Sequence, residues 1–145
     1  IRPEDFVIAR PDGSLLRGER APTSEYRLHV ELHQTRPDCR CVVHAHAPYA
    51  IAASLAGINL PETYITVAPV PTTEYARISS EQSPAVLRPF MADYNWAILP
   101  RHGVVAWAGS IWDAFLRVEG LEHSAKILMT ARACGPGGAA GGPGR

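Results

Sequence analysis

Two histidines separated by one residue end an apolar run in the first third of the chain. His44 and His46 follow Val42 and Val43, and Pro48 comes two residues later. Alternate side chains of a β-strand point to the same face, so both imidazoles would lie side by side at a strand end. Such a pair could supply two ligands to a metal ion. Packed or surface histidines explain the same spacing, because short motifs of this kind also occur without a metal.

A third histidine, His102, lies in a short connection between two apolar runs, 96–99 and 104–107, that we expect to be strands. Its neighbour Gly103 allows a close approach of two backbones or an unusual φ. A catalytic zinc site needs three protein ligands and one open position. Three histidines with an open corner would meet that requirement.

A carboxylate precedes the histidine pair. Thr23 and Ser24 can cap a helix predicted over 24–35, and Glu25 then lies in its first turn. The helix dipole favours a negative charge there, and that role alone would account for Glu25. The alternative is that Glu25 transfers protons beside the three histidines.

Two other groups have metal-ligand spacing and are better explained by packing. His29 and His33 are one helical turn apart, but they lack the glutamate of a His-Glu-x-x-His motif. Cys39 and Cys41 precede the histidine strand, and we expect both to lie on the face opposite the histidines.

Composition indicates one domain of an ordinary globular protein. The 145 residues are 46% hydrophobic and 19% charged, and 14 basic residues balance 14 acidic ones. This balance gives no reason to expect nucleic acid or a membrane as partner, and no apolar run is long enough to span a bilayer. The three cysteines do not form a disulfide framework, which favours the cytoplasm. The first residue, Ile1, is not methionine, and we expect an upstream segment of the domain to be missing.

The pattern of apolar, turn and capping residues predicts alternating strands and helices. We expect a domain over 1–134 and a disordered tail of glycine, alanine and proline over 135–145. The expected elements are a hairpin around Gly13, helices over 24–35, 49–56, 79–93 and 111–133, and strands over 39–46, 63–67, 96–99 and 104–107. On the last helix, we expect one buried face made of Ile111, Ala114, Val118, Leu121, Ala125 and Leu128.

Three motifs give the chain a specific resemblance. Residues 22–25 (Pro-Thr-Ser-Glu), 43–46 (Val-His-Ala-His) and 101–104 (Arg-His-Gly-Val) are similar to the hallmarks of the class II aldolase/adducin family, in the family's order and approximate spacing. The resemblance runs from about residue 4 to 133. It implies an α/β fold with three α/β/α layers and a mainly antiparallel central sheet. It also implies a homotetramer with sites at the subunit interfaces.

The resemblance further implies a role for each motif. His44, His46 and His102 match the zinc ligands, and Glu25 matches the general acid/base of the aldolases. Thr23 and Ser24 match hydroxyl positions that help to hold the substrate phosphate. The implied activity is that of a zinc-dependent lyase, which cleaves a small ketose phosphate of the fuculose-1-phosphate type by a retro-aldol reaction through a metal-stabilised enediolate.

Alternatives within the resemblance remain open. Relatives with the same three histidines carry out decarboxylation, dehydration or epimerisation, and histidine ligands also suit Mn, Co, Fe and Ni. A non-enzymatic module like that of adducin is the third alternative, although that branch lacks the histidines. The family's upstream Gly-Asn loop and a catalytic tyrosine in the C-terminal tail have no counterpart here.

Overall fold

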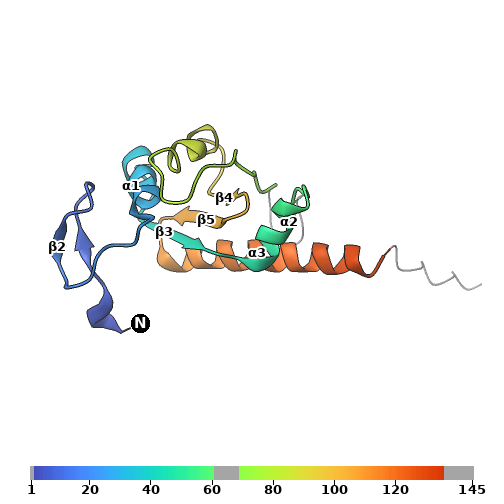
Figure 1. Ribbon diagram of the computed structural model, residues 1–145, viewed down its shortest axis with the longest axis horizontal. Helices are drawn as coiled ribbons and strands as arrows, with labels where there is room; N and C mark the ends of the chain where they lie inside the picture. Colours follow the sequence, from blue (N-terminus) through green and yellow to red (C-terminus); the bar gives the residue numbers. More distant parts are fainter. Residues whose placement is uncertain (1, 61–68, 136–145) are drawn as a thin grey trace, which may run out of the picture.

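The computed structural model describes residues 2–60 and 69–135 (Figure 1). The expected strand over 63–67 and almost all of the expected tail lie outside these residues. No helix in the described part of the chain is long and apolar enough to cross a membrane.

The chain begins with a hairpin that stands to one side of the body of the molecule (Figure 1). After a 3₁₀ turn, η1 (Pro3–Asp5), strands β1 (Ile8–Ala9) and β2 (Leu15–Arg17) pair antiparallel, as predicted. Gly13 adopts a φ of 85° in the turn, a conformation that favours glycine.

The central sheet is antiparallel, with strands in the order β3-β5-β4. Its members are β3 (Cys41–Ala45), β4 (Trp96–Leu99) and β5 (Gly103–Ala108). The segment around Thr72, in the loop between α2 and η2, follows the outer edge of β4. There the backbone N–H of Ile98 donates to the carbonyl of Pro71 at 2.8 Å.

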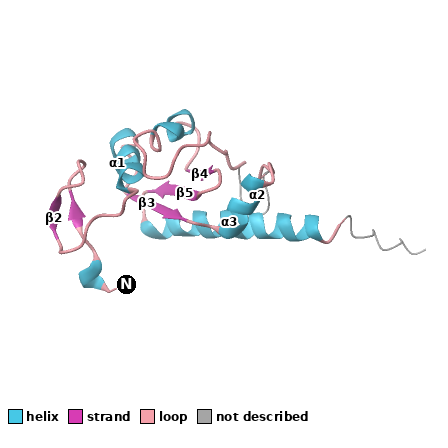
Figure 2. Cartoon of the chain, in the orientation of Figure 1, coloured by secondary structure: helices cyan, strands magenta, loops and turns pink. Residues whose placement is uncertain are grey.

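Helices cover both faces of this sheet, which gives the predicted three layers (Figure 2). Alternate residues of β5 face opposite sides. Val105 and Trp107 pack with buried residues of α1 (Tyr26–Thr35), whereas Val104 and Ala106 pack with those of α2 (Pro48–Leu55) and α3 (Ile111–Ala133). β5 is therefore buried on both faces and lies at the centre of the sheet.

The prediction of an α-helix over 79–93 is wrong in both the type and the length of the helix. This segment forms turns and a short 3₁₀ helix, η2 (Ala85–Phe90), with Pro89 inside it. Proline has no backbone N–H to donate, so a regular α-helix cannot continue through the segment. On α3 the predicted bounds are confirmed, but Ile111 at its first position is 56% exposed rather than buried.

Candidate metal centre

The end of β3 brings the first histidine to the site. His44 is paired with Val105 across the sheet, and its Nδ1 lies 2.9 Å from the carbonyl oxygen of Val104. A carbonyl oxygen can only accept, so Nδ1 carries the proton and Nε2 of the neutral ring has a lone pair. That Nε2 lies 2.8 Å from Oε2 of Glu25.

The other two histidines approach the same carboxylate from chain segments next to the strands. His46 follows β3, has a side chain that is 63% exposed, and places Nε2 3.5 Å from Oε2 of Glu25. His102 is buried in the turn before β5 and places Nε2 3.0 Å from Oε1 of Glu25. The three ring centroids are 4.8 to 5.2 Å apart. The structure therefore brings together all four residues that the sequence singled out.

Glu25 lies one position earlier than predicted, as the N-cap of α1 rather than in its first turn. Its backbone N–H donates to Oγ1 of Thr23 at 3.3 Å, and the expected side-chain cap by Thr23 or Ser24 is absent from the described helix start. Burial alone would raise the pKa of the Glu25 carboxyl, but electrostatic interaction with the neighbouring imidazoles of His44 and His102 more than offsets this and lowers it.

The polar atoms of this cluster fit a cation. Nε2 of His44, Nε2 of His102 and Oε1 of Glu25 are buried, and none has an aligned hydrogen-bond partner among the described residues. One ligand atom from each of Glu25, His44, His46 and His102 lies within 4.8 Å of the others. Buried polar groups without partners are costly, and a metal ion would satisfy all of them at once.

Gly103 explains how β5 comes so close to the histidine strand. A Cβ at this position would lie 2.4 Å from the carbonyl oxygen of Ala45 and 3.2 Å from the ring of His44. Of the two reasons offered by the sequence, close backbone approach is the one that applies, because the φ of Gly103 is not positive.

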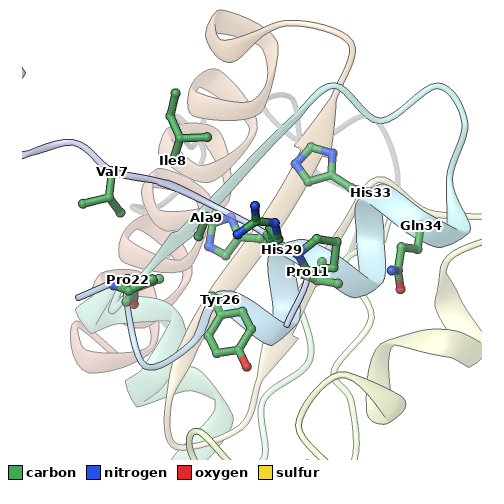
Figure 3. Close-up of a pocket in the computed structure, with 12 residues that line it drawn as sticks. Val7, Ile8, Ala9, Pro11, Pro22, Tyr26, His29, His33 and Gln34 are labelled. Carbon is green, nitrogen blue, oxygen red and sulfur yellow. The ribbon is translucent and has the colours of Figure 1, made fainter. Parts of the chain in front are cut away.

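The remaining candidates lie outside the cluster. Nδ1 of His33 lies 3.2 Å from the carbonyl oxygen of Cys39, and both His29 and His33 line a mainly apolar pocket between the hairpin and α1 (Figure 3). Thr23 lines the same pocket. Ser24, the next residue in the chain, is exposed.

Cys39 corrects one expectation. It packs with Leu28 and Leu32 beneath α1, on the side of the sheet that carries His44, rather than on the opposite face. The strand begins only at Cys41, so strand alternation does not extend back to Cys39. The prediction that Cys39 is a packing residue agrees with its burial, which raises the pKa of its thiol.

Sequence reasoning missed one carboxylate near the site. Glu122 on α3 accepts hydrogen bonds from the backbone N–H groups of Tyr49 and Ala50, both at 2.9 Å. The sequence did contain one signal, because α2 begins with Pro48 and its N-cap residue Ala47 has no capping side chain. This signal indicates that a cap is needed, but it does not identify the distant residue that supplies it.

Comparison with known proteins decides the family. The model of the Class II Aldolase and Adducin N-terminal domain matches residues 1–129. The chain belongs to this family.

Characterised members of the family resemble the chain over most of its length. The 5-deoxy-D-ribulose 1-phosphate aldolase of Bacillus thuringiensis is 32% identical over 138 residues, which cover 92% of this chain and 65% of that protein. The 3,4-dihydroxyphthalate decarboxylase of Arthrobacter keyseri is 32% identical over 86% of this chain and 54% of its own length. A solved L-fuculose 1-phosphate aldolase superposes with a TM-score of 0.83 at 30% identity, covering 93% of this chain and 66% of that one. The chain thus spans less than two thirds of the length of these relatives.

Proposed function

We propose that this chain carries the catalytic centre of a metal-dependent lyase, with a divalent cation held by His44, His46 and His102. The observation that supports this proposal is the convergence of three imidazoles on the carboxylate of Glu25. Zinc is the first expectation, because three histidines with one further position form a common catalytic zinc site. The same donors also suit other divalent transition metals.

The tautomer of the His44 ring supports this proposal. Its Nδ1–H is used by the carbonyl oxygen of Val104, so the neutral ring presents a lone pair to a carboxylate oxygen 2.8 Å away. Two electron pairs at this distance repel each other unless a positive charge lies at the same place. A protonated imidazole can supply that charge, and so can a metal ion. The burial of His102 favours the ion, because burial lowers the pKa of this imidazole and disfavours its protonated form.

We propose that the reaction separates two carbon atoms of a small ketose phosphate of the fuculose-1-phosphate type. A bound divalent cation stabilises the negative charge that develops on the substrate oxygens as the bond breaks. Glu25 lies beside all three histidines and would transfer the proton to or from the substrate, with its lowered pKa keeping it in the basic form at neutral pH.

The phosphate would lie near the start of α1. Thr23 and Ser24 supply hydroxyl groups directly before Glu25, and a helix N-terminus favours an anion. The names of the Bacillus relative and of the solved structural neighbour, both sugar-phosphate aldolases, support this choice of substrate class.

Decarboxylation is the second candidate, because the Arthrobacter relative is named as a decarboxylase and is equally similar at 32% identity. Loss of CO₂ from a suitable acid also leaves negative charge that a cation can stabilise. A panel of sugar phosphates and of β-keto and aromatic acids separates the two reactions. Release of an aldehyde supports the aldolase, and release of CO₂ in its place supports the decarboxylase.

We further infer a homo-oligomer, with a tetramer as the expected form. Trp112 and Phe115 at the start of α3 stack edge to face at 6.2 Å, and both are exposed. Exposed apolar groups of this kind are typical of subunit contacts. Light scattering tests the assembly, and a cytoplasmic location stays a prediction from the cysteines.

The decisive experiment combines elemental analysis with the substrate panel on purified protein and its Glu25→Gln variant. We expect one divalent metal ion per chain in both proteins and a loss of turnover of about 10²-fold or more in the variant. Unchanged turnover would overturn the role of Glu25, and the absence of a stoichiometric metal would overturn the metal centre.

A further inference from the structure

The three histidines of the candidate centre are held in different ways. His44 belongs to β3, and a hydrogen bond to Val104 fixes its ring. His46 lies after the end of β3, and His102 lies in the turn before β5. The positions of His46 and His102 therefore depend on what holds these two connecting segments.

The segment that carries His46 continues directly into α2, and a carboxylate from α3 holds the start of that helix. Oε1 of Glu122 accepts from the N–H of Tyr49, and Oε2 accepts from the N–H of Ala50, both at 2.9 Å. The N-cap residue Ala47 has no side chain able to cap, so Glu122 supplies the cap from a distance. Because Ala47 is itself buried, the path from the strand to the helix has little freedom.

The other end of α2 holds the turn that carries His102. The hydroxyl oxygen of Ser54 accepts the backbone N–H of Arg101 at 3.0 Å, and the same hydroxyl donates to the carbonyl of Ile51 at 2.7 Å. Arg101 has a φ of 63°, which is unusual for a residue other than glycine. Ser54 therefore stabilises a strained residue immediately before His102.

The geometry of this turn explains why that support matters. The N–H of His102 donates to the carbonyl of Leu99 at 3.1 Å, with Pro100 and Arg101 between them. Proline followed by a residue with positive φ is the pattern of a type II turn, in which glycine usually occupies the second position. The turn leaves the N–H of Arg101 unused, and Ser54 is its partner.

We propose that α2 is a brace that sets the separation of His46 and His102, with Glu122 and Ser54 as its two positioning residues. The helix is only eight residues long, and Ala50 and Ala53 pack it tightly into the core shared with α3. The hydrogen bonds of both anchors go to backbone groups of α2 and of the turn before β5. The inference rests on the proposed metal function of the three histidines.

The brace has a measurable consequence. Zinc requires its nitrogen ligands at about 2.0–2.1 Å in a tetrahedral arrangement, so a ligand that is free to shift binds more weakly. Residues that orient ligands from outside the first shell typically contribute about 10- to 100-fold in metal affinity. Loss of either anchor should therefore weaken metal binding by at least about tenfold, while the sheet that carries His44 stays folded.

The test measures zinc affinity by competition with a chromophoric chelator, on metal-free protein and on the variants Glu122→Gln and Ser54→Ala. Glu119→Gln removes an equivalent charge from an exposed position of the same helix and is the matched control. Arg88→Gln removes an ion pair with Glu31 that involves neither anchor, and it controls for lower stability. We expect weaker zinc binding in the first two variants only, and recovery in Ser54→Thr, which keeps the hydroxyl.

Cobalt(II) substitution gives a second readout. The visible absorption bands of bound cobalt report ligand geometry, so we expect altered bands in Glu122→Gln and Ser54→Ala and unaltered bands in the two controls. Wild-type affinity and spectra in both anchor variants would overturn the brace while leaving the metal centre intact. Failure of the wild-type protein to bind zinc or cobalt would instead overturn the proposed function. If Glu122→Gln does not fold, comparison of Ser54→Ala with Ser54→Thr still decides the question.

Discussion

The Nδ1–H of His44 donates to the backbone carbonyl oxygen of Val104 across the sheet, at 2.9 Å. This bond selects the tautomer of the ring and leaves Nε2 free to bind a cation. The acceptor belongs to the backbone of β5. Substitution of the Val104 side chain therefore leaves this carbonyl oxygen in place unless the strand itself moves. The chemistry of the site is thus tied to strand pairing.

Metal removal should lower the thermal stability of the protein. A ligand that binds only the folded state stabilises it, by about 2.7 kcal/mol when the free metal is at about 100 times its Kd. We expect zinc to raise the Tm of chelator-treated wild type and to have little effect on His46→Ala. Differential scanning calorimetry measures both shifts. His123→Ala, at an exposed position of α3, should keep the full zinc response, and loss of the response there would indicate that zinc acts elsewhere.

Mild acid should destabilise the metal-free protein in part through His29. Burial first, and then the nearby charges of His44 and His33, lower the pKa of His29 below its ordinary value. The unfolded chain therefore takes up a proton near pH 6.5 that the folded chain resists, and stability falls as the pH falls through this range.

Urea unfolding at pH 7.5 and 5.5 checks this prediction. We expect His29→Asn to lose part of the stability difference between the two pH values. His102 contributes to this difference with the same sign, because burial also lowers its pKa. The carboxyl of Glu25 contributes only near and below its ordinary pKa of 4.5, outside this window. An unchanged difference in His29→Asn would contradict the assignment.

Gly103→Ala should damage both the fold and the metal centre. The added Cβ would lie 2.4 Å from the carbonyl oxygen of Ala45, so β3 and β5 must move apart beneath His44. Forcing an extra carbon into a packed core costs about 1–3 kcal/mol. Urea denaturation gives the loss of stability, and metal analysis gives the loss of zinc. Gly109→Ala is the control, because its Cβ would meet only Asp38, at 3.9 Å.

We expect the stability of the fold to depend on the guanidinium group of Arg36, so that lysine cannot replace it. Its guanidinium donates to the carbonyl oxygens of Met91 and Tyr94 and to the side chains of Asp38 and Asn95, joining the end of α1 to the segment before β4. An ammonium group cannot match this planar arrangement.

We expect Arg36→Lys to lower the free energy of unfolding by about 1.5–3 kcal/mol, the range for hydrogen bonds to charged groups. Arg88→Lys alters an exposed ion pair with Glu31 and should change it by about 1 kcal/mol or less. Equal effects of the two substitutions in urea denaturation would count against the special role of Arg36.

The sequence predicted best the elements whose pattern is local. Alternation along the histidine strand predicted the face of His44, but it failed at Cys39, which lies before the strand begins. The predicted bounds of α3 are confirmed, and Ser110 caps this helix through the N–H of Asp113 at 3.1 Å. The residue types suggested that His102 and Glu25 could join the histidine pair, and the family resemblance made this hypothesis specific. Such convergence depends on strand order, which one sequence does not reveal.

The errors had both local and long-range causes. The apolar pattern and capping residues near 79–93 favoured an α-helix, but Pro89 interrupts the hydrogen bonds and the segment packs as 3₁₀ turns. Ile111 has the spacing of a buried residue, yet it lies at the first position of α3 and is mostly exposed. Glu122 reads as a surface carboxylate until α2 is placed beside it.

The bond between His44 and Val104 joins residues 60 positions apart in the chain. During synthesis, the histidine pair leaves the ribosome long before the strand that fixes its tautomer. Until β5 has formed, a nascent chain offers two flexible imidazoles rather than a shaped site. We therefore expect the proposed metal to bind only after the sheet has closed in the correct register.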